Sequence, residues 1–245
     1  MSCHDAFFSQ QLRFVHTTTY PGTVDPALSV YLFDSNSIAS KYVPTLAQHC
    51  LHSSELEVFS KRKQLQAQQE YTASRVLIKI YASHCLGYNY ADLAVQFDEQ
   101  DTCLKVFHKN QAIKLGCCIS HSHGQVLIAL TKQVQLLGVD LEWISTRRSL
   151  DKLAAHYYHA EELQACKGRS NAALYRIWTL KEALAKTIKQ PIVKLIRDNV
   201  FTHCSKLNVR SGNNQDFDIS IISDTPLPET LDVQVVSVDL AVFKQ

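Results

Sequence analysis

Hydrophobic and polar positions along this chain of 245 residues alternate with two periodicities, one typical of helices and one typical of strands. Residues 53–84 carry a long helical pattern, in which apolar positions such as Val76 and Ile80 recur on one helix face. Residues 171–189 form the strongest helical segment of the chain, and Pro191 predicts its end. Two long helices, one in each half of the chain, are therefore expected.

Shorter segments surround these two helices. We expect further helices at residues 44–52 and 150–166, and strands at residues 29–33, 104–107, 116–120, 125–131, 134–142, 206–209, 217–222 and 233–243. The run Ser-Gly-Asn-Asn at 211–214 is a turn signal between two of the strands. Each half thus has a long helix followed by several strands. This predicts an α+β fold in which a similar unit is used twice, with residues 1–134 as the N-terminal half and residues 135–245 as the C-terminal half.

Composition limits the classes of function. Apolar residues make up 46% of the chain and charged residues 20%, which is typical of a globular protein with a sizeable core. The 25 Lys and Arg residues against 23 Asp and Glu residues leave a net charge of +2, less than a strongly basic nucleic-acid-binding protein carries. We therefore expect no nucleic-acid partner.

The length of the apolar runs, the N-terminal residues and the spacing of the cysteines together predict where in the cell the protein is found. No apolar run reaches the roughly 18 residues that a membrane span needs. The N-terminal residues carry an early acid and no continuous apolar stretch, which argues against a signal peptide. None of the 8 cysteines forms a C-x-x-C pair or a zinc-like spacing with histidine. We expect reduced thiols in a cytoplasmic protein without a membrane partner.

Two carboxylates share one face of the strand predicted at 134–142. Residues two apart on a strand project to the same side, so Asp140 and Glu142 lie together while Val139 and Leu141 face the other way. Neighbouring carboxylates repel each other unless a cation lies between them, and Mg²⁺ takes oxygen ligands of this kind. The alternative is a solvated acidic strand edge, which an isolated D-x-E pattern favours.

Glu182 and Lys186 lie four positions apart on one face of the helix predicted at 171–189. One interpretation assigns Glu182 to a metal ion and Lys186 to a phosphate group. The other is a surface ion pair that stabilises the helix by a few tenths of a kcal/mol. Lys181 points about 100° away from Glu182 on a helix and is the weaker candidate.

Ser120, His121 and Ser122 stand at the end of a predicted strand. The G-x-S-x-G turn of a serine hydrolase is absent, and neighbouring Ser and His side chains on an extended chain point apart. A polar cluster of this kind between apolar strands suits contacts to an anion. A simple polar turn is the alternative, of equal weight.

The order and spacing of these three motifs resemble the signature of the Sfp-type 4′-phosphopantetheinyl transferases. S-H-S, G-V-D-L-E and W-T-L-K-E-A-L-A-K occur in the family's order at 120–122, 138–142 and 178–186. Residues 71–79 are similar to the family's upstream helix, and residues 157–162 resemble the segment between its last two motifs. The resemblance covers about residues 51–190 and is most specific in the last motif.

This resemblance implies a pseudo-dimer of two α+β halves with coenzyme A in the cleft between them. It implies that the phosphopantetheine arm moves to a serine of an apo acyl or peptidyl carrier protein, which releases adenosine 3′,5′-bisphosphate. Mg²⁺ would be held by Asp140, Glu142 and Glu182. Lys186 and His121 would contact phosphate oxygens, and Ser120 would help to bind coenzyme A. Glu182 would take the serine proton, either directly or through a metal-bound water.

The length of the chain resembles that of the monomeric, two-half group of the family. The carriers served by such enzymes belong to fatty-acid, polyketide, nonribosomal-peptide or lysine biosynthesis. Two other classes of function stay open: a non-catalytic descendant that binds carrier protein or coenzyme A, and a metal-dependent phosphohydrolase. An intact carboxylate trio argues against the non-catalytic class, because buried acids are costly to keep.

The segments that bind the nucleotide end of coenzyme A in the family differ in this chain. The usual G-(K/R)-P segment before S-H-S is replaced by Asn-Gln-Ala at 110–112, and Lys79 stands where Arg is usual. The 3′-phosphate of coenzyme A needs a cationic partner. We expect Lys63, from the basic run at 61–63, and Arg75 to supply it. The alternative is a solvated run beside a local ion pair of Arg75.

A second basic group follows the carboxylate motif. Arg147, Arg148 and Lys152 lie shortly after Glu142 in sequence. We expect them to attract an acidic carrier protein, an effect on association rate and salt dependence. A solvated basic turn is an equally weighted alternative.

Overall fold

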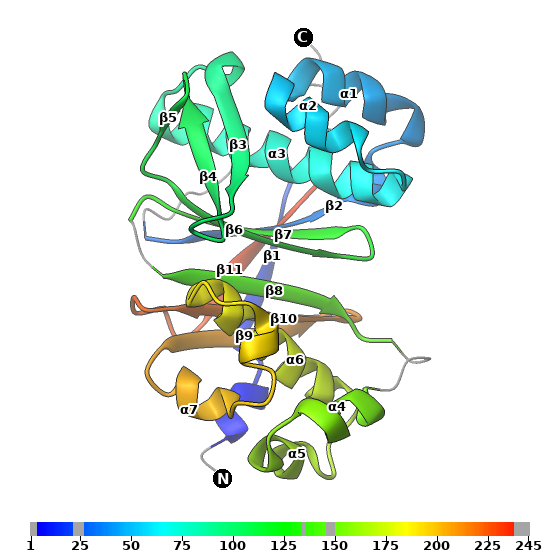
Figure 1. Ribbon diagram of the computed structural model, residues 1–245, viewed down its shortest axis with the longest axis vertical. Coiled ribbons are helices and arrows are strands. Elements are labelled where there is room, and N and C mark those ends of the chain that lie inside the picture. The colour runs from blue at the N-terminus through cyan, green and yellow to red at the C-terminus, as the bar shows by residue number, and fades with distance from the viewer. Residues whose placement is uncertain (1–3, 22–26, 134–135, 146–149, 238–245) are drawn as a thin grey trace. The chain divides into compact units, whose positions relative to one another are not determined.

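The computed structural model describes residues 4–21, 27–133, 136–145 and 150–237 (Figure 1). The chain divides into two compact units, each made of two stretches. We call them the α3 unit, Val15–Val134 with Val233–Gln245, and the α6 unit, Met1–Phe14 with Gln135–Asp232. The proposed boundary between residues 134 and 135 falls on residues outside the described ranges and stays a prediction.

The α3 unit combines a mixed sheet with three α-helices. Its helices are α1 (Val43–Cys50), α2 (Ser53–Ser60) and α3 (Leu65–Leu86), with short 3₁₀ turns η2 (Ser35–Ser37), η3 (Ser40–Tyr42) and η4 (Tyr90–Asp92). Its strands are β2 (Ser29–Asp34), β3 (Leu93–Asp98), β4 (Cys103–His108), β5 (Gln111–Ala112), β6 (Gly116–Ser122) and β7 (Gln125–Thr131). The strand order is β2-β7-β6-β4-β3, and β5 pairs with β4. The boundary between the units falls within two strands, β1 (Leu12–Thr17) and β11 (Leu231–Val236), so each strand contributes residues to both units. The strand β11 runs parallel to β2.

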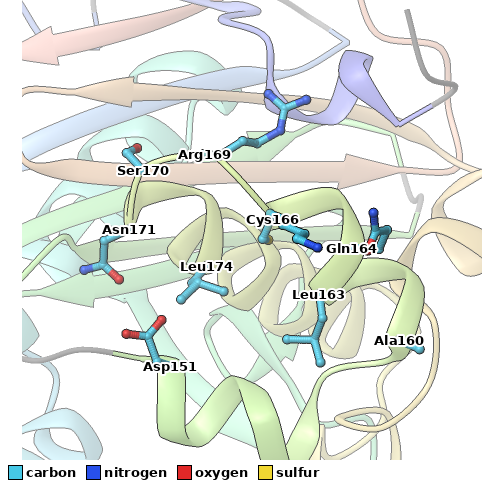
Figure 2. Close-up of a pocket in the computed structure, with 10 residues that line it drawn as sticks. Asp151, Ala160, Leu163, Gln164, Cys166, Arg169, Ser170, Asn171 and Leu174 are labelled. Carbon is cyan, nitrogen blue, oxygen red and sulfur yellow. The ribbon is translucent and has the colours of Figure 1, made fainter.

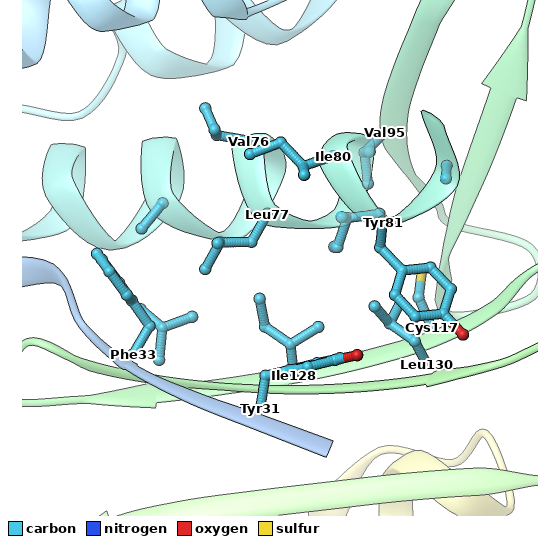
Figure 3. Close-up of a cluster of buried hydrophobic side chains, with 14 of the residues drawn as sticks. Tyr31, Phe33, Val76, Leu77, Ile80, Tyr81, Val95, Cys117, Ile128 and Leu130 are labelled. Carbon is cyan, nitrogen blue, oxygen red and sulfur yellow. The ribbon is translucent and has the colours of Figure 1, made fainter. Parts of the chain in front are cut away.

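The core of the α3 unit lies between α3 and the sheet. Figure 3 shows Leu77 and Tyr81 of α3 pointing toward Tyr31, Phe33 and Ile128 of the strands. All five side chains are almost completely buried. The helix predicted here is confirmed, but the prediction of a single apolar stripe is wrong: every residue from Gln69 to Ala82 is buried, so this part of α3 is enclosed on all sides rather than along one face.

The α6 unit contains a three-stranded antiparallel sheet. The strands β8 (Leu137–Trp143), β9 (Asn208–Asn214) and β10 (Phe217–Ser223) pair in the order β8-β10-β9. Its helices are α4 (Asp151–Tyr157), α5 (Ala160–Cys166), α6 (Ala172–Thr187) and α7 (Val200–Cys204), with 3₁₀ turns η1 (Asp5–Phe8) and η5 (Ile192–Lys194). Helix α6 packs against β8 and β10.

Each unit follows the same order of elements. One strand (β2 or β8) is followed by short helices, then a long helix (α3 or α6), then a later antiparallel hairpin. The strand order β2-β7-β6 of the α3 unit matches the order β8-β10-β9 of the α6 unit, and both are antiparallel. The mixed α+β class predicted from the sequence is confirmed, and this shared order supports the interpretation of two similar halves.

A buried ion pair recurs at the same place in both units. Lys79 of α3 lies 3.2 Å from Glu55 of α2, and Lys181 of α6 lies 2.8 Å from Glu162 of α5. Each glutamate is the third residue of its short helix and caps the backbone N–H of a histidine that begins the helix. These caps are His52 and His159. The pair therefore joins the short helix to the long helix in each unit.

Several predicted elements are confirmed with small changes of their ends: α1, α6, β2, β4, β6, β7, β8 and β10. The segment 53–84 is two helices rather than one, because Lys61 ends α2 and Gln64 begins α3. The segment 150–166 is likewise divided, at His159, whose side chain accepts a hydrogen bond from Glu161 N–H at the start of α5.

Other predictions are wrong or incomplete. The turn predicted at 211–214 lies in β9, and the hairpin turns at 215–216, where Gln215 has a φ of 51°. The strands β1 and β3 were not expected. The last predicted strand is observed as β11, and residues 238–243 of that prediction lie outside the described residues. Among the described residues, no helix combines the length and apolar character that crossing a membrane requires.

Candidate functional site

The strand β8 and the helix α6 approach each other closely at Gly138. A Cβ atom on this glycine would stand 2.0 Å from the carbonyl oxygen of Ala183 and 2.3 Å from the hydroxyl of Thr187. Any larger residue would push the C-terminal part of α6 away from β8. The glycine of the G-V-D-L-E motif therefore sets the distance between the two elements that carry the predicted carboxylates.

Lys186 and Asp140 meet at this close approach. Lys186 Nζ donates to Asp140 Oδ1 at 2.8 Å and to the carbonyl oxygen of Val139 at 2.9 Å. Asp140 is buried, whereas the Lys186 side chain is 31% exposed. The ion pair joins the second and third sequence motifs, which the sequence placed on separate elements.

Glu182 lies one helical turn before Lys186, on the same side of α6. Burial raises the pKa of Glu182, and the nearby charge of Asp140 raises it further, while Lys186 opposes both effects. The structure therefore brings Glu182 near enough to Asp140 for their charges to interact. This raised pKa indicates two carboxylates that a cation between them would stabilise.

Glu142 is half-buried and lies two residues beyond Asp140 on β8, opposite Asp218 of β10. The donor set of Asp140, Glu142 and Glu182 has the chemistry that Mg²⁺ prefers, because all three offer carboxylate oxygens. Among the described residues, which include these three, no group of three His, Cys, Asp or Glu side chains is arranged as a metal cluster. The structure brings Asp140 and Glu182 near enough for their charges to interact. The metal-binding trio stays a prediction.

A buried polar network continues the same interface toward the start of α6. Arg176 Nε donates to both oxygens of Asp218 at 2.9 and 3.0 Å, and Thr179 donates to Asp218 at 2.7 Å. Thr179 also shares a hydrogen bond with Ser220. This network was not expected from the sequence, although polar residues three apart on an otherwise apolar helix were the available signal. It fixes the rotation of α6 and hence the face that carries Glu182.

Lys181 points away from this interface. Its side chain is almost fully buried, lies 2.8 Å from Glu162 and donates to the carbonyl oxygen of Asp198 at 2.6 Å. Burial lowers the pKa of Lys181, and Glu162 opposes that shift. Lys181 therefore holds α6 in place, next to Glu182 in sequence but on a different face.

The S-H-S motif lies at the end of β6 in the α3 unit. Ser120 and Ser122 are buried, and the His121 side chain between them is 46% exposed. His121 Nδ1 lies 3.0 Å from Glu70 Oε2 of α3. The alternation of the three side chains along the strand agrees with the expected extended backbone, whereas the contact with Glu70 had no signal in the sequence.

The two basic residues expected to bind the 3′-phosphate, Lys63 and Arg75, differ in how far they are buried. Lys63 is exposed, while its neighbour Arg62 is half-buried and stacks over the ring of Tyr71, with 4.5 Å to the centroid. Arg75 stacks over the same ring at 4.3 Å, is 7% exposed and donates to Ser74. The alternative interpretation, a local ion pair of Arg75, is wrong for Glu70, whose carboxylate contacts His121 instead.

Among the described residues, no carboxylate neutralises the charge of Arg62 or Arg75. Within the described chain, neither guanidinium forms an ion pair, and the buried Nε of each has no hydrogen-bond partner. Burial lowers the pKa of Arg75, while Tyr71 and Glu55 oppose that effect and Arg62 adds to it. This arrangement of two cations on one aromatic ring suits an anion.

The basic group expected to attract a carrier protein is only partly described. Arg147 and Arg148 lie outside the described residues, and Lys152 is exposed in the first turn of α4. A hollow of about 790 Å³ adjoins this helix (Figure 2). It is lined by Asp151, Ala160, Leu163, Gln164, Cys166, Lys167, Arg169, Ser170, Asn171 and Leu174. None of the predicted site residues lines it, so the hollow is separate from the carboxylates.

Comparison with known proteins adds independent information. Residues 136–227 match the family model of the 4′-phosphopantetheinyl transferase superfamily. A solved structure of a holo-(acyl-carrier-protein) synthase from Bacillus anthracis, in complex with CoA (3′,5′-ADP), is similar over 43% of this chain and 93% of that chain. The identity is 18% and the TM-score is 0.35. No curated protein sequence matches the chain.

The matched residues contain β8 and α6, and therefore the second and third motifs with the Asp140–Lys186 pair. This match confirms the resemblance that the motifs indicated: residues 136–227 of the chain are similar to the 4′-phosphopantetheinyl transferase superfamily.

Proposed function

We propose that this protein transfers the 4′-phosphopantetheine group from coenzyme A to a serine hydroxyl of an apo acyl or peptidyl carrier protein. The products are the holo carrier protein and adenosine 3′,5′-bisphosphate. The observation that carries the proposal is the joining of two family motifs in one site, where Lys186 of α6 binds Asp140 of β8 with Glu182 one turn away. The family match over residues 136–227 supports it.

The reaction requires positioning and charge neutralisation more than covalent help from the protein. The serine oxygen forms a bond to the phosphorus that carries pantetheine, and the bond from that phosphorus to the leaving adenosine bisphosphate breaks. Lys186 has a flexible, partly exposed side chain that can bind a phosphate oxygen and offset the charge of the leaving group.

Asp140, Glu142 and Glu182 are the residues that would hold Mg²⁺. When bound, the ion would supply positive charge to the pyrophosphate oxygens. The repulsion between Asp140 and Glu182 favours a divalent cation at this place, and Lys186 partly compensates their charge in the ligand-free protein.

Glu182 is the proposed acceptor of the serine proton. Burial and Asp140 raise its pKa above the ordinary value, and a base with a raised pKa holds a transferred proton better. Glu182 thus has two proposed roles, as a carboxylate ligand and as a base.

The α3 unit is proposed to contribute contacts to coenzyme A. His121 and Ser120 of the S-H-S motif would contact phosphate groups, as the family resemblance implies. Arg75 and Lys63 are proposed for the 3′-phosphate, and Arg62 joins them because it stacks on Tyr71 beside Arg75. We further propose a monomer that acts in the cytoplasm on carriers of fatty-acid, polyketide or nonribosomal-peptide synthesis.

One experiment separates this function from its alternatives. The protein is incubated with Mg²⁺, coenzyme A and an apo carrier protein, and all products are followed by mass spectrometry. A phosphopantetheine adduct on the carrier supports the transferase. Hydrolysed coenzyme A without an adduct indicates the phosphohydrolase, and binding without either product indicates a non-catalytic module. Either of these last two results overturns the proposal.

A further inference from the structure

We propose that Glu70 is a positioning residue for His121, which it holds with Nδ1 protonated so that Nε2 faces the ligand. This inference rests on the proposed function for its role in coenzyme A binding. The assignment of the ring atoms itself rests on the contacts of Glu70 and His121 within the α3 unit.

The two side chains come from elements that pack on each other. Glu70 is in α3, where it is 6% exposed, and His121 is in β6. Glu70 Oε2 lies 3.0 Å from His121 Nδ1. The other carboxylate oxygen, Oε1, accepts hydrogen bonds from the backbone N–H of Gly124 at 2.8 Å and from Gln66 Nε2 at 2.9 Å. Both oxygens of this buried group are therefore in use, and its orientation is determined.

The turn between β6 and β7 strengthens this arrangement. Gly124 has a φ of 85°, and a Cβ atom at this position would stand 2.0 Å from Asn36. Its carbonyl oxygen accepts hydrogen bonds from the backbone N–H and the hydroxyl of Ser35. The N–H that Glu70 binds is thus itself fixed, and the carboxylate cannot rotate without losing it.

Glu70 is held as a carboxylate. Burial acts to raise its pKa, but the hydrogen bonds from His121, Gln66 and Gly124 outweigh burial, and the pKa lies below the ordinary value. An ionised carboxylate only accepts hydrogen bonds, so the hydrogen between Glu70 and His121 belongs to Nδ1 of the imidazole.

The consequence concerns the other ring nitrogen. In the part of the chain that the structure describes, the His121 side chain has one ion-pair or hydrogen-bond partner, Glu70, and the ring is nearly half exposed. With Nδ1 turned toward α3, Nε2 is the atom available to a ligand. When the ring also carries a proton on Nε2, that Nε2–H donates to a phosphate oxygen. Glu70 therefore prepares His121 for an anion without touching that anion.

The substitution Glu70→Gln tests this with little change of shape. The amide oxygen of the new side chain stays on Gly124 N–H, because that group can only donate. Its NH₂ group then faces His121 Nδ1, which must become an acceptor, so the neutral ring changes from the Nδ1–H to the Nε2–H tautomer. Imidazole ¹⁵N shifts report the tautomer directly, at about pH 8.5, above the ordinary titration range of an imidazole.

Two controls belong to this measurement. His159 Nδ1 already accepts a backbone N–H, from Glu161, so its resonance marks the Nε2–H tautomer in both proteins. Gln66→Ala removes another partner of Glu70 without touching His121, and His121 should keep its Nδ1–H tautomer there. A His121 ring in the same tautomer in wild type and Glu70→Gln overturns the proposal.

Kinetics test whether this orientation serves the ligand. Glu70→Gln should raise the KM for coenzyme A about fivefold, and it should add nothing further in a His121→Ala background, because the two residues act as one unit. An equal loss in both backgrounds overturns the positioning role, as does an unchanged KM. If the tautomer changes but wild type transfers no phosphopantetheine, the proposed function fails while the orientation of His121 by Glu70 is upheld.

Discussion

Gly138 of β8 lies so close to Ala183 of α6 that a Cβ atom on the glycine would stand 2.0 Å from the alanine's carbonyl oxygen. The atom in the way belongs to the helix backbone, so relief requires a shift of the whole helix end rather than of one side chain. Lys186 lies in this helix end and Glu182 directly precedes it. The positions of both side chains therefore depend on how closely α6 packs on β8.

The first prediction concerns this contact. Gly138→Ala should destabilise the protein by about 1–3 kcal/mol, the range of overpacking substitutions, and should lower activity by separating Lys186 from Asp140. Thermal unfolding and the transfer assay check both effects. Gly168→Ala is the matched control, because its Cβ meets no atom within 4 Å and only its φ of 77° opposes the change. A Gly138→Ala protein with wild-type stability, and as active as Gly168→Ala, would contradict the prediction.

The second prediction concerns the carboxylate that joins the two motifs. Asp140→Asn keeps the shape of the side chain but removes its charge, and we expect transfer activity to fall by about 100-fold or more. Metal dependence should weaken with it, and the melting temperature should change little. The control Glu57→Gln alters an exposed carboxylate of α2 and should leave activity unchanged. Full Mg²⁺-dependent activity in Asp140→Asn would remove Asp140 from the site.

The third prediction compares a buried ion pair with an exposed one. Lys181→Met leaves the fully buried Glu162 without its cationic partner and should cost about 3–5 kcal/mol of the free energy of unfolding. Lys61→Met breaks a pair whose side chains are 69% and 73% exposed, and the expected cost is much smaller, because water screens exposed charges. Chemical denaturation measures both. Equal costs would show that the buried pair does not hold α6.

The fourth prediction concerns acid stability through Glu70. Its pKa in the folded protein lies below the ordinary value, so its ionised form contributes stability above the ordinary pKa of about 4.3. That contribution is lost as the pH falls through the lowered pKa. The free energy of unfolding of Glu70→Gln should therefore fall short of wild type most at neutral pH, and the difference should shrink on acidification. A difference that grows toward low pH would refute the assigned direction.

The sequence predicted much of this molecule because its main signals are local. The helix containing Val76 and Ile80 required only the period of a helix, and the order of the three motifs required only the chain itself. The missed features are long-range. The contact of Glu70 with His121 depends on the packing of α3 on β6, and that of Arg176 with Asp218 depends on the packing of α6 on β10. No local pattern contains either pairing.

The misplaced hairpin turn has a physical reason of the same kind. Ser-Gly-Asn-Asn at 211–214 has turn composition, yet these residues form cross-strand pairs with β10. Gly212 is used for close packing instead, since a Cβ there would stand 2.7 Å from Gln10. The reversal falls on Gln215, where positive φ is imposed by the register of the two strands. Tertiary pairing thus overrides turn propensity at this hairpin.

The last prediction concerns the 3′-phosphate of coenzyme A. Arg62 and Arg75 stack on Tyr71, and within the described chain neither guanidinium has a carboxylate partner, whereas Lys63 is exposed. A phosphate near Arg62 would relieve the repulsion between the two cations. We expect wild type to prefer coenzyme A over 3′-dephospho-coenzyme A as donor, and Arg62→Ala to reduce that preference by about tenfold.

The comparison includes Arg75→Ala and Lys63→Ala, each assayed with both donors. Arg75→Ala should also lose discrimination, and its folding is checked separately because the side chain is buried. Lys63→Ala should lose less discrimination than Arg62→Ala, because Lys63 is exposed and Arg62 is half-buried. A loss in Lys63→Ala as large as in Arg62→Ala would assign the main contact to the exposed part of the run. If all three variants discriminate as wild type does, the 3′-phosphate is bound by other residues. The cation pair on Tyr71 would then have a structural role only.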